Sequence, residues 1–175
     1  LLTCPPEKKE NYEAMKISLE AAILLSKRYK AIAEEKAAAS DGEKKELFTL
    51  MAQALGKVPY EPASGLYEAI QSYILMWQTM CLEQAPNPFA FSVGNADRIF
   101  EPYRKMSGFD RETTAALLKH FLVFFNVGDR SWAISQNVLI SGRDADGNDL
   151  TNTMSYAIMD AYYDMNLPQP ILSVK

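Results

Sequence analysis

The chain has 175 residues, 48% of them hydrophobic, which is enough for one domain with a substantial core. Its 18 basic and 22 acidic side chains are mixed along the sequence and leave a net charge of −4, so we expect no nucleic-acid partner. No apolar run is long enough to span a membrane, and the first residues lack the pattern of a signal peptide, so we expect a cytoplasmic protein without a membrane partner.

The first half of the chain is predicted to be helical. Apolar residues spaced three or four apart predict one long amphipathic helix over residues 7–38. Ser40 and Glu43 have the spacing of a capping box, which predicts a second helix over residues 43–55. Residues 66–81 are apolar on nearly every side, which predicts a helix that is buried all round.

The second half alternates short apolar runs with helical patterns. Buried strands are predicted at residues 89–93, in the run SQNVLIS and at residues 171–174. Asp110 is the predicted N-cap of a helix over residues 113–125, and Thr151 that of a helix over residues 152–165. We therefore expect a helix-rich α/β fold, with a helical part at residues 1–84 and helices alternating with short strands at residues 85–175.

The stretch SGRDADGNDLTN gathers acidic and amide side chains around a glycine and allows three interpretations: a calcium loop, a catalytic carboxylate cluster or a turn. Counted from Asp144, Gly147 is the fourth residue and Ser155 the twelfth, so the glycine and the final carboxylate of an EF-hand are out of place. A turn from a strand into a helix fits better, because Gly and Asn suit left-handed backbone positions. An acid–base site remains a minority interpretation.

No other residue forms a self-contained active site. His120 has no second histidine or cysteine at ligand spacing and reads as an ordinary helical residue. Cys4 and Cys81 form no disulfide framework or zinc motif, and Cys81 has apolar neighbours that offer no base. The sequence also lacks a glycine-rich phosphate loop. We expect no metal or cofactor to be bound by this chain.

A set of ordered motifs, however, extends over nearly the whole chain. The segments are KRYKAIAEE, VPYEPASGLYEAIQSY, FSVGNADRIFEPY and the stretch from residue 132 to the end, whose matching residues are Gln136, Asn137, Gly142, Asp144, Gly147, Asp149, Thr151, Asn152, Ser155, Tyr156, Pro168, Gln169, Pro170, Leu172 and Ser173. Together they resemble the glycyl radical enzymes, the pyruvate formate-lyase superfamily. The family pattern for the last stretch is Q-N-x-x-x-G-G-x-D-x-x-G-x-D-x-T-N, then a helix, then P-Q-P-x-L-S-x-R.

Five positions depart from the family pattern. Asn95 replaces an arginine, Arg98 a glutamine, Ser141 the first glycine of a pair, Thr153 a glutamate and Lys175 an arginine. These departures place the chain either outside the best-known subfamilies or in a lineage with relaxed constraint.

The resemblance implies that residues 1–175 are a partial domain of the pyruvate formate-lyase type. They would supply N-terminal helices and a few strands of a ten-stranded α/β barrel. In the family, a glycyl radical is installed by an S-adenosylmethionine-dependent activating enzyme and acts through a cysteine, and both residues lie C-terminal to everything matched here. The segment would therefore be inactive alone. Ser92 matches a serine that contacts substrate hydroxyls in dehydratases, and Trp132 matches a pocket aromatic of the formate-lyase type. The alternative is that both residues only pack in the barrel.

The leading hypothesis is an internal fragment of a glycyl radical lyase or dehydratase whose partners are the rest of the enzyme and the activating enzyme. A non-catalytic remnant or helical assembly module is the alternative, and a calcium-binding module is third. An incomplete barrel would leave strand edges and apolar faces such as Phe121, Phe124 and Phe125 without partners. We therefore also expect self-association into a homo-oligomer.

Overall fold

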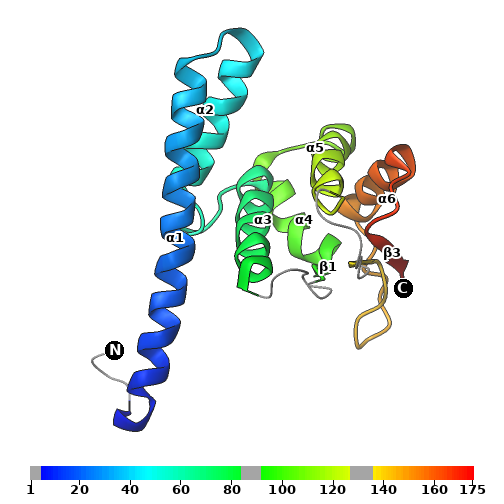
Figure 1. Cartoon of the computed structure of the whole chain (residues 1–175). Helices are drawn as coiled ribbons and strands as arrows, with labels where there is room; N and C mark the ends of the chain where they lie inside the picture. The colour runs from blue at the N-terminus through cyan, green and yellow to red at the C-terminus, as the bar shows by residue number, and fades with distance from the viewer. Residues whose placement is uncertain (1–4, 84–91, 127–135) are drawn as a thin grey trace. The chain divides into compact units, whose positions relative to one another are not determined.

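The computed structural model describes residues 5–83, 92–126 and 136–175, which form two compact units (Figure 1). The first unit is Leu1–Ala63 with Gln71–Met76, and the second is Ser64–Ile70 with Trp77–Lys175. No helix in these described ranges is long and apolar enough to cross a membrane.

The first unit is a helical hairpin. A short 3-10 helix, η1 (Pro6–Lys8), leads into α1 (Lys9–Ala38), which packs against α2 (Gly42–Lys57). The contact uses small buried side chains on α1, Ala22, Ser26 and Ala33, which allow the two helices to approach closely. The long first helix is confirmed. The predicted capping box is wrong, because the N-cap of α2 is Asp41 and no side chain caps that end.

Helix α3 (Leu66–Glu83) follows a loop and contributes residues to both units. Leu66, Ala69, Ile70 and Leu75 are buried, but Leu82 is 70% exposed and most of the side chains between them are only half-buried. The prediction of a helix buried on every side is therefore wrong for the described structure. The sequence shows that the helix is apolar, but not how many neighbours cover it.

The second unit contains a three-stranded parallel sheet in the order β1 (Gly94–Asn95), β2 (Asn137–Ile140), β3 (Ile171–Val174). Val138 and Ile140 of the central strand are buried, whereas their neighbours Asn137 and Leu139 are half-buried. The predicted strands β2 and β3 are confirmed, but the expectation that β3 is buried is wrong, because Ile171 and Val174 are 46% and 61% exposed. The strand predicted at residues 89–93 lies mostly outside the described residues, and the structure has β1 directly after it.

Three helices accompany this sheet, namely α4 (Ala96–Ser107), α5 (Arg111–Phe124) and α6 (Thr153–Met165). Asp110 caps α5 as predicted, since its side chain accepts a hydrogen bond from Thr113 N. Helix α4 was not predicted, since only a loop was expected after the strand at residues 89–93; Pro102 lies inside this helix. Two signals could have revealed its end: Arg104 and Lys105 in the last turn, and Gly108 at φ 67° after it.

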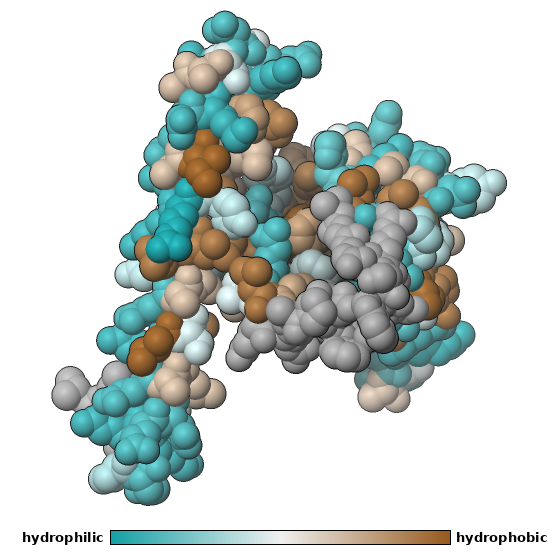
Figure 2. Space-filling model, viewed as in Figure 1, coloured by the Kyte–Doolittle hydropathy of each residue, from teal (hydrophilic) through white to brown (hydrophobic). Residues whose placement is uncertain are grey.

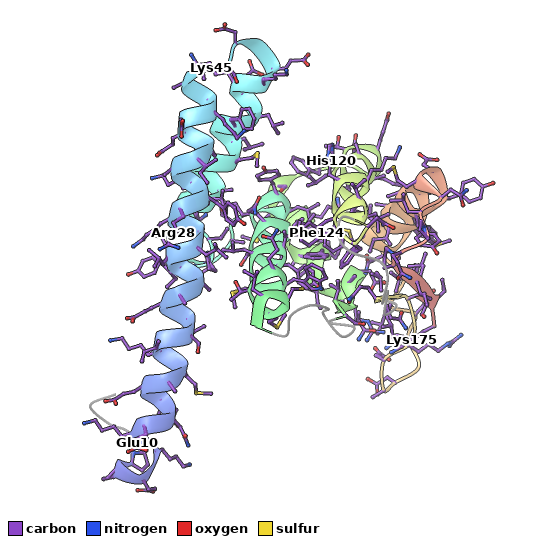
Figure 3. The ribbon with its side chains drawn as sticks, viewed as in Figure 1. Glu10, Arg28, Lys45, His120, Phe124 and Lys175 are labelled. Atoms are coloured by element: carbon purple, nitrogen blue, oxygen red, sulfur yellow. The ribbon has the colours of Figure 1, made fainter. Side chains whose placement is uncertain are left out.

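An aromatic cluster lies between the helices of this unit, and Figure 3 marks Phe124 among its side chains. Trp77 contacts Phe124 edge-on with 4.9 Å between ring centroids, and Phe121 contacts Phe125 in the same way at 5.0 Å. Phe121 also meets Phe100 and is only 2% exposed. The expectation that Phe121, Phe124 and Phe125 lack partners is therefore wrong. They find those partners on α3 and α4, the second of which the sequence pattern did not reveal.

Candidate functional site

The first turn of α4 places a buried acid at the carboxyl end of the sheet. Asp97 is 0% exposed, and its Oδ2 accepts hydrogen bonds of 2.6 Å from Ser141 N, just beyond β2, and from Ser155 Oγ on α6. Its Oδ1 accepts from Arg98 N at 2.8 Å. One carboxylate thus joins the start of α4, the end of β2 and the start of α6. Ligands of open parallel sheets commonly bind at this end of the strands.

Two cations lie beside this acid. Arg98 Nη2 donates to Ser141 O at 2.8 Å, while its buried Nε has no hydrogen-bond partner among the described residues. Lys175, at the end of β3 in Figure 3, has Nζ 3.4 Å from Asn95 Oδ1. Within the described part of the chain neither cation forms an ion pair. The end of the sheet therefore carries polar donors held in place by the fold.

The backbone after β2 turns sharply between these groups. Ser141 has φ 64° and Gly142 has φ 100°, so both lie in the left-handed region. A Cβ at Gly142 would lie 3.0 Å from Arg98 Nη2 and 3.2 Å from Lys175 Cβ, which is tighter than ordinary contact. Glycine at position 142 is therefore required by both its backbone and its neighbours, whereas Ser141 tolerates strain that a glycine would not have.

Replacing Ser141 by glycine is expected to stabilise the second unit by about 0.5–1 kcal/mol. A non-glycine residue in the left-handed region costs about 1–2 kcal/mol, of which the greater freedom of glycine in the unfolded chain offsets about half. The hydrogen bonds of Ser141 to Asp97 and Arg98 use its backbone and survive the change. Urea unfolding of Ser141→Gly and Ser141→Ala provides the test, since the alanine variant keeps the Cβ and should gain nothing. A glycine variant less stable than the alanine variant would contradict the explanation.

Four of the five departures from the family pattern meet in this one place. Asn95 contacts Lys175, Arg98 contacts Ser141, and Gly142 lies against both cations. Asn95 and Lys175 are 80 residues apart in sequence, and Arg98 and Ser141 are 43 residues apart. The sequence alone therefore gives no sign that these residues are neighbours. An arginine is lost at position 95 and gained at position 98, and the site thereby keeps a guanidinium group.

The loop that follows, residues 141–152, is a turn in which acidic side chains accept hydrogen bonds from other residues of the same loop. Both oxygens of Asp144 accept hydrogen bonds, from Asp146 N and from the backbone and side chain of Asn148, all at 2.9 Å. These bonds, above all that of the Asn148 side chain, lower the pKa of Asp144. Gly147 takes φ 85°. The turn interpretation is confirmed.

The predicted cap of the following helix is wrong by one residue. The N-cap of α6 is Asn152, which forms a capping box with Ser155, whereas Thr151 N donates to Asp149 Oδ1. Ser155 Oγ accepts from Asn152 N at 3.0 Å while it donates to Asp97. The capping box is thus part of the Asp97 network.

Other candidate groups show no chemistry of their own. His120 is exposed on α5 (Figure 3), and burial raises the pKa of the Cys81 thiol to about 11, so the thiol is protonated at neutral pH. Glu101 on α4 is held by Arg104 through two 2.8 Å bonds, which lower the pKa of its carboxyl. No group of three or more His, Cys, Asp or Glu residues suited to a metal ion occurs among the described residues.

Of the two residues expected in a substrate pocket, Ser92 lies within the described part of the chain and Trp132 does not. Ser92 is exposed at the opposite end of the strands from Asp97, where its Oγ accepts a hydrogen bond of 3.2 Å from Asn137 N. The structure therefore does not bring Ser92 together with the Asp97 network. Trp132 lies outside the described residues, as does Cys4.

The second unit also has an open groove of about 830 Å³ between α5, α6 and β3. Four of its five charged side chains are joined across the helices, Arg111 to Asp160 and Lys119 to Asp164. Leu172 and Val174 of β3 form its apolar side. The groove is a seam between elements rather than a site with free catalytic groups.

Comparison with known proteins gives consistent matches. Residues 4–175 match the sequence model of the family described as "Pyruvate formate lyase-like". The isethionate sulfite-lyase of Desulfovibrio desulfuricans is 28% identical over an alignment 186 residues long, which covers 97% of this chain and 22% of that protein. The crystal structure of hydroxyproline dehydratase from Clostridioides difficile, with trans-4-hydroxy-L-proline bound, matches with a TM-score of 0.87 and 28% identity over 95% of this chain and 23% of that one.

The glycerol-bound form of the B12-independent glycerol dehydratase from Clostridium butyricum matches with a TM-score of 0.85 and 25% identity, over 98% of this chain and 24% of that one. The chain therefore spans less than a quarter of the length of these relatives, and almost all of it belongs to the part that they share.

Proposed function

Because this chain belongs to the pyruvate formate-lyase-like family, the glycyl radical enzymes, we propose that it is one part of a radical lyase or dehydratase that breaks a carbon–carbon, carbon–nitrogen or carbon–oxygen bond. In this proposal residues 1–175 are a partial domain of the pyruvate formate-lyase type, which supplies outer helices and part of the wall of the substrate pocket. The observation that carries it is the match of residues 4–175 to the family together with coverage of only 22–24% of its full-length relatives.

The parallel sheet supports a place in a barrel wall. Its three strands are short, run in one direction and have helices between them, which is the connection that a closed α/β barrel repeats. β1 and β3 are the edge strands of the described sheet, so further strands of the same enzyme have a place to pair. The radical glycine, the radical cysteine and most of the pocket would come from the remainder of the enzyme.

The proposed substrates are small hydroxylated molecules. Two of the solved relatives are dehydratases, bound to glycerol and to trans-4-hydroxy-L-proline, and both of these molecules carry hydroxyl groups. Ser92 is suited to such a ligand, because its Oγ accepts from Asn137 N and its hydroxyl proton makes no bond with a described residue. We assign Ser92 to a contact with a substrate hydroxyl and Trp132 to the pocket wall.

The test begins with the reading frame that encodes this chain. The proposal requires that the same polypeptide continues to a cysteine-containing loop and a later R-V-x-G-Y segment. The whole protein should then gain a glycyl radical signal in electron paramagnetic resonance after anaerobic incubation with a radical S-adenosylmethionine activating enzyme, whereas residues 1–175 alone should gain none. A native product without these segments would contradict the enzyme proposal. We further expect the whole enzyme to be a cytoplasmic homo-oligomer.

In the activated whole enzyme, replacing Ser92 by alanine is expected to lower kcat/KM for a hydroxylated substrate by about 10-fold. One hydrogen bond contributes about 0.5–1.5 kcal/mol, and about 1.4 kcal/mol corresponds to a factor of ten. Ser18→Ala removes another exposed serine hydroxyl, on α1, and serves as the control. An unchanged kcat/KM for Ser92→Ala at equal glycyl radical content would remove Ser92 from the pocket.

A further inference from the structure

The N-terminal half of α1 carries an apolar strip that no described element covers. Tyr12, Met15 and Leu19, which we call the α1 strip, are 41%, 61% and 57% exposed. They are three and four residues apart and so lie on one face of the helix. Figure 2 shows hydrophobic side chains on the surface of α1 over much of its length. Buried aromatic and aliphatic side chains are the rule in folded proteins, so three exposed ones in a row need an explanation.

The strip is a continuation of an interface that already exists. At the same spacing, α1 continues with Ala22, Ser26 and Ala33, which are 1%, 2% and 4% exposed. Ser26 Oγ lies 2.8 Å from the carbonyl oxygens of Leu55 and Val58, so the end of α2 at Lys57 is opposite Ser26. Figure 1 shows α1 extending well past that end of α2. Only the lack of a second helix beyond α2 leaves the strip uncovered.

The charges beside the strip need no outside partner. Lys9 pairs with Glu13 at 3.8 Å, and Lys16 pairs with Glu20 at 3.5 Å, each one turn apart on the helix. A neighbouring element would therefore contact only the apolar side chains of the α1 strip. The ridges of a helix with this spacing pack best against those of another helix. Residues 9–21 are about 20 Å long at 1.5 Å per residue, so the neighbour needs about three to four turns.

We propose that the α1 strip is covered by an amphipathic helix from the remainder of the same enzyme. The inference rests on the proposed function, because it takes this chain to be part of a longer polypeptide. Solved relatives match 95–98% of this chain, so α1 belongs to the shared fold and is not an appendage. In those relatives more than three-quarters of the polypeptide lies outside the matched part and is available to supply the cover.

Cysteine labelling tests this directly. Leu19→Cys places a thiol on the strip, and Glu13→Cys places one on the ion-paired side of the same helix as a matched control, both in a Cys4→Ser background. In residues 1–175 alone, a maleimide should label both thiols at similar rates. In the whole polypeptide, Leu19→Cys should react about 100-fold more slowly than Glu13→Cys, because labelling of a covered thiol waits for local opening.

Equal rates at the two positions in the whole polypeptide would overturn the inference. Protection of Leu19→Cys in residues 1–175 alone would overturn it as well, because the cover would then be this chain folded back on itself or a second copy of it. Labelling does not depend on catalysis, so its outcome is separate from the radical signal that tests the proposed function. A Leu19→Ala variant that folds like the parent provides a check that the strip tolerates substitution.

Discussion

Replacing Asp97 by alanine is expected to lower the free energy of unfolding of the second unit by about 3–4 kcal/mol. Asp97 is completely buried and accepts hydrogen bonds from Ser141 N, Ser155 Oγ and Arg98 N. Loss of the carboxylate leaves at least two buried donors unsatisfied, and each costs about 1–3 kcal/mol. Urea unfolding followed by tryptophan fluorescence measures the change.

Asp144 offers a matched control in the same loop region. It also accepts three hydrogen bonds, but it is exposed, so its donors can bond to water when the side chain is removed. Asp144→Ala should therefore cost about 1 kcal/mol or less. Asp97→Asn, which keeps the size and one acceptor oxygen, should fall between the two. If Asp97→Ala and Asp144→Ala had equal effects, burial would not be what makes the Asp97 network important.

The strands and the longest helices could be predicted because each is a local pattern. Alternating or periodic apolar residues identified β2, β3, α1, α5 and α6 with ends close to those observed. The prediction failed where contacts with residues distant in sequence determine whether an element forms. Helix α4 forms in spite of Pro102 because Phe100 is buried and Asp97 and Glu101 are bonded, and none of these contacts is visible in a local window.

The candidate site was missed for the same reason. The bonds of Asp97 to Ser141 and Ser155 join residues 44 and 58 apart in sequence. The sequence instead drew attention to Asp144 and its neighbours, where the acids are close in the chain but bond only to their own loop. One local signal was available: Ser141 and Gly142 follow a strand at a place where the family pattern has two glycines. That pattern marks left-handed backbone, and the structure has it at both residues.

Four of the departures from the family pattern contact one another in the folded structure. Arg98 bonds Ser141 O from the first turn of α4, and Asn95 accepts from Lys175 across the end of the sheet. Each of these four substitutions therefore has another substituted position as its partner. Such a set is what compensating changes at one site would produce, and changes in contact are expected to be coupled in their effects on stability. The chain thus retains the family's scaffold while it alters the groups presented at the strand ends.

Replacing Phe121 by alanine is expected to lower the free energy of unfolding of the second unit by about 3–4 kcal/mol. The ring is 2% exposed and meets Phe100 and Phe125 edge-on, with 5.7 and 5.0 Å between centroids. Removing a buried phenylalanine costs about 3–5 kcal/mol, because contacts are lost and a cavity remains. Phe121→Leu refills most of the space and should cost about 1–1.5 kcal/mol.

The measurement decides between two views of this helix face. If Phe121 belonged to an uncovered surface, as the sequence suggested, its removal would leave stability nearly unchanged and would reduce self-association. As part of the aromatic core, its removal must lower stability and should increase association by loosening the unit. Val123→Ala, at a 39% exposed position on the same helix, supplies the baseline and should cost about 0.5 kcal/mol or less. If the Phe121→Ala protein were as stable as the Val123→Ala protein, Phe121 would not be a core residue. The aromatic cluster that includes Trp77 and Phe124 would then not be the core of this unit.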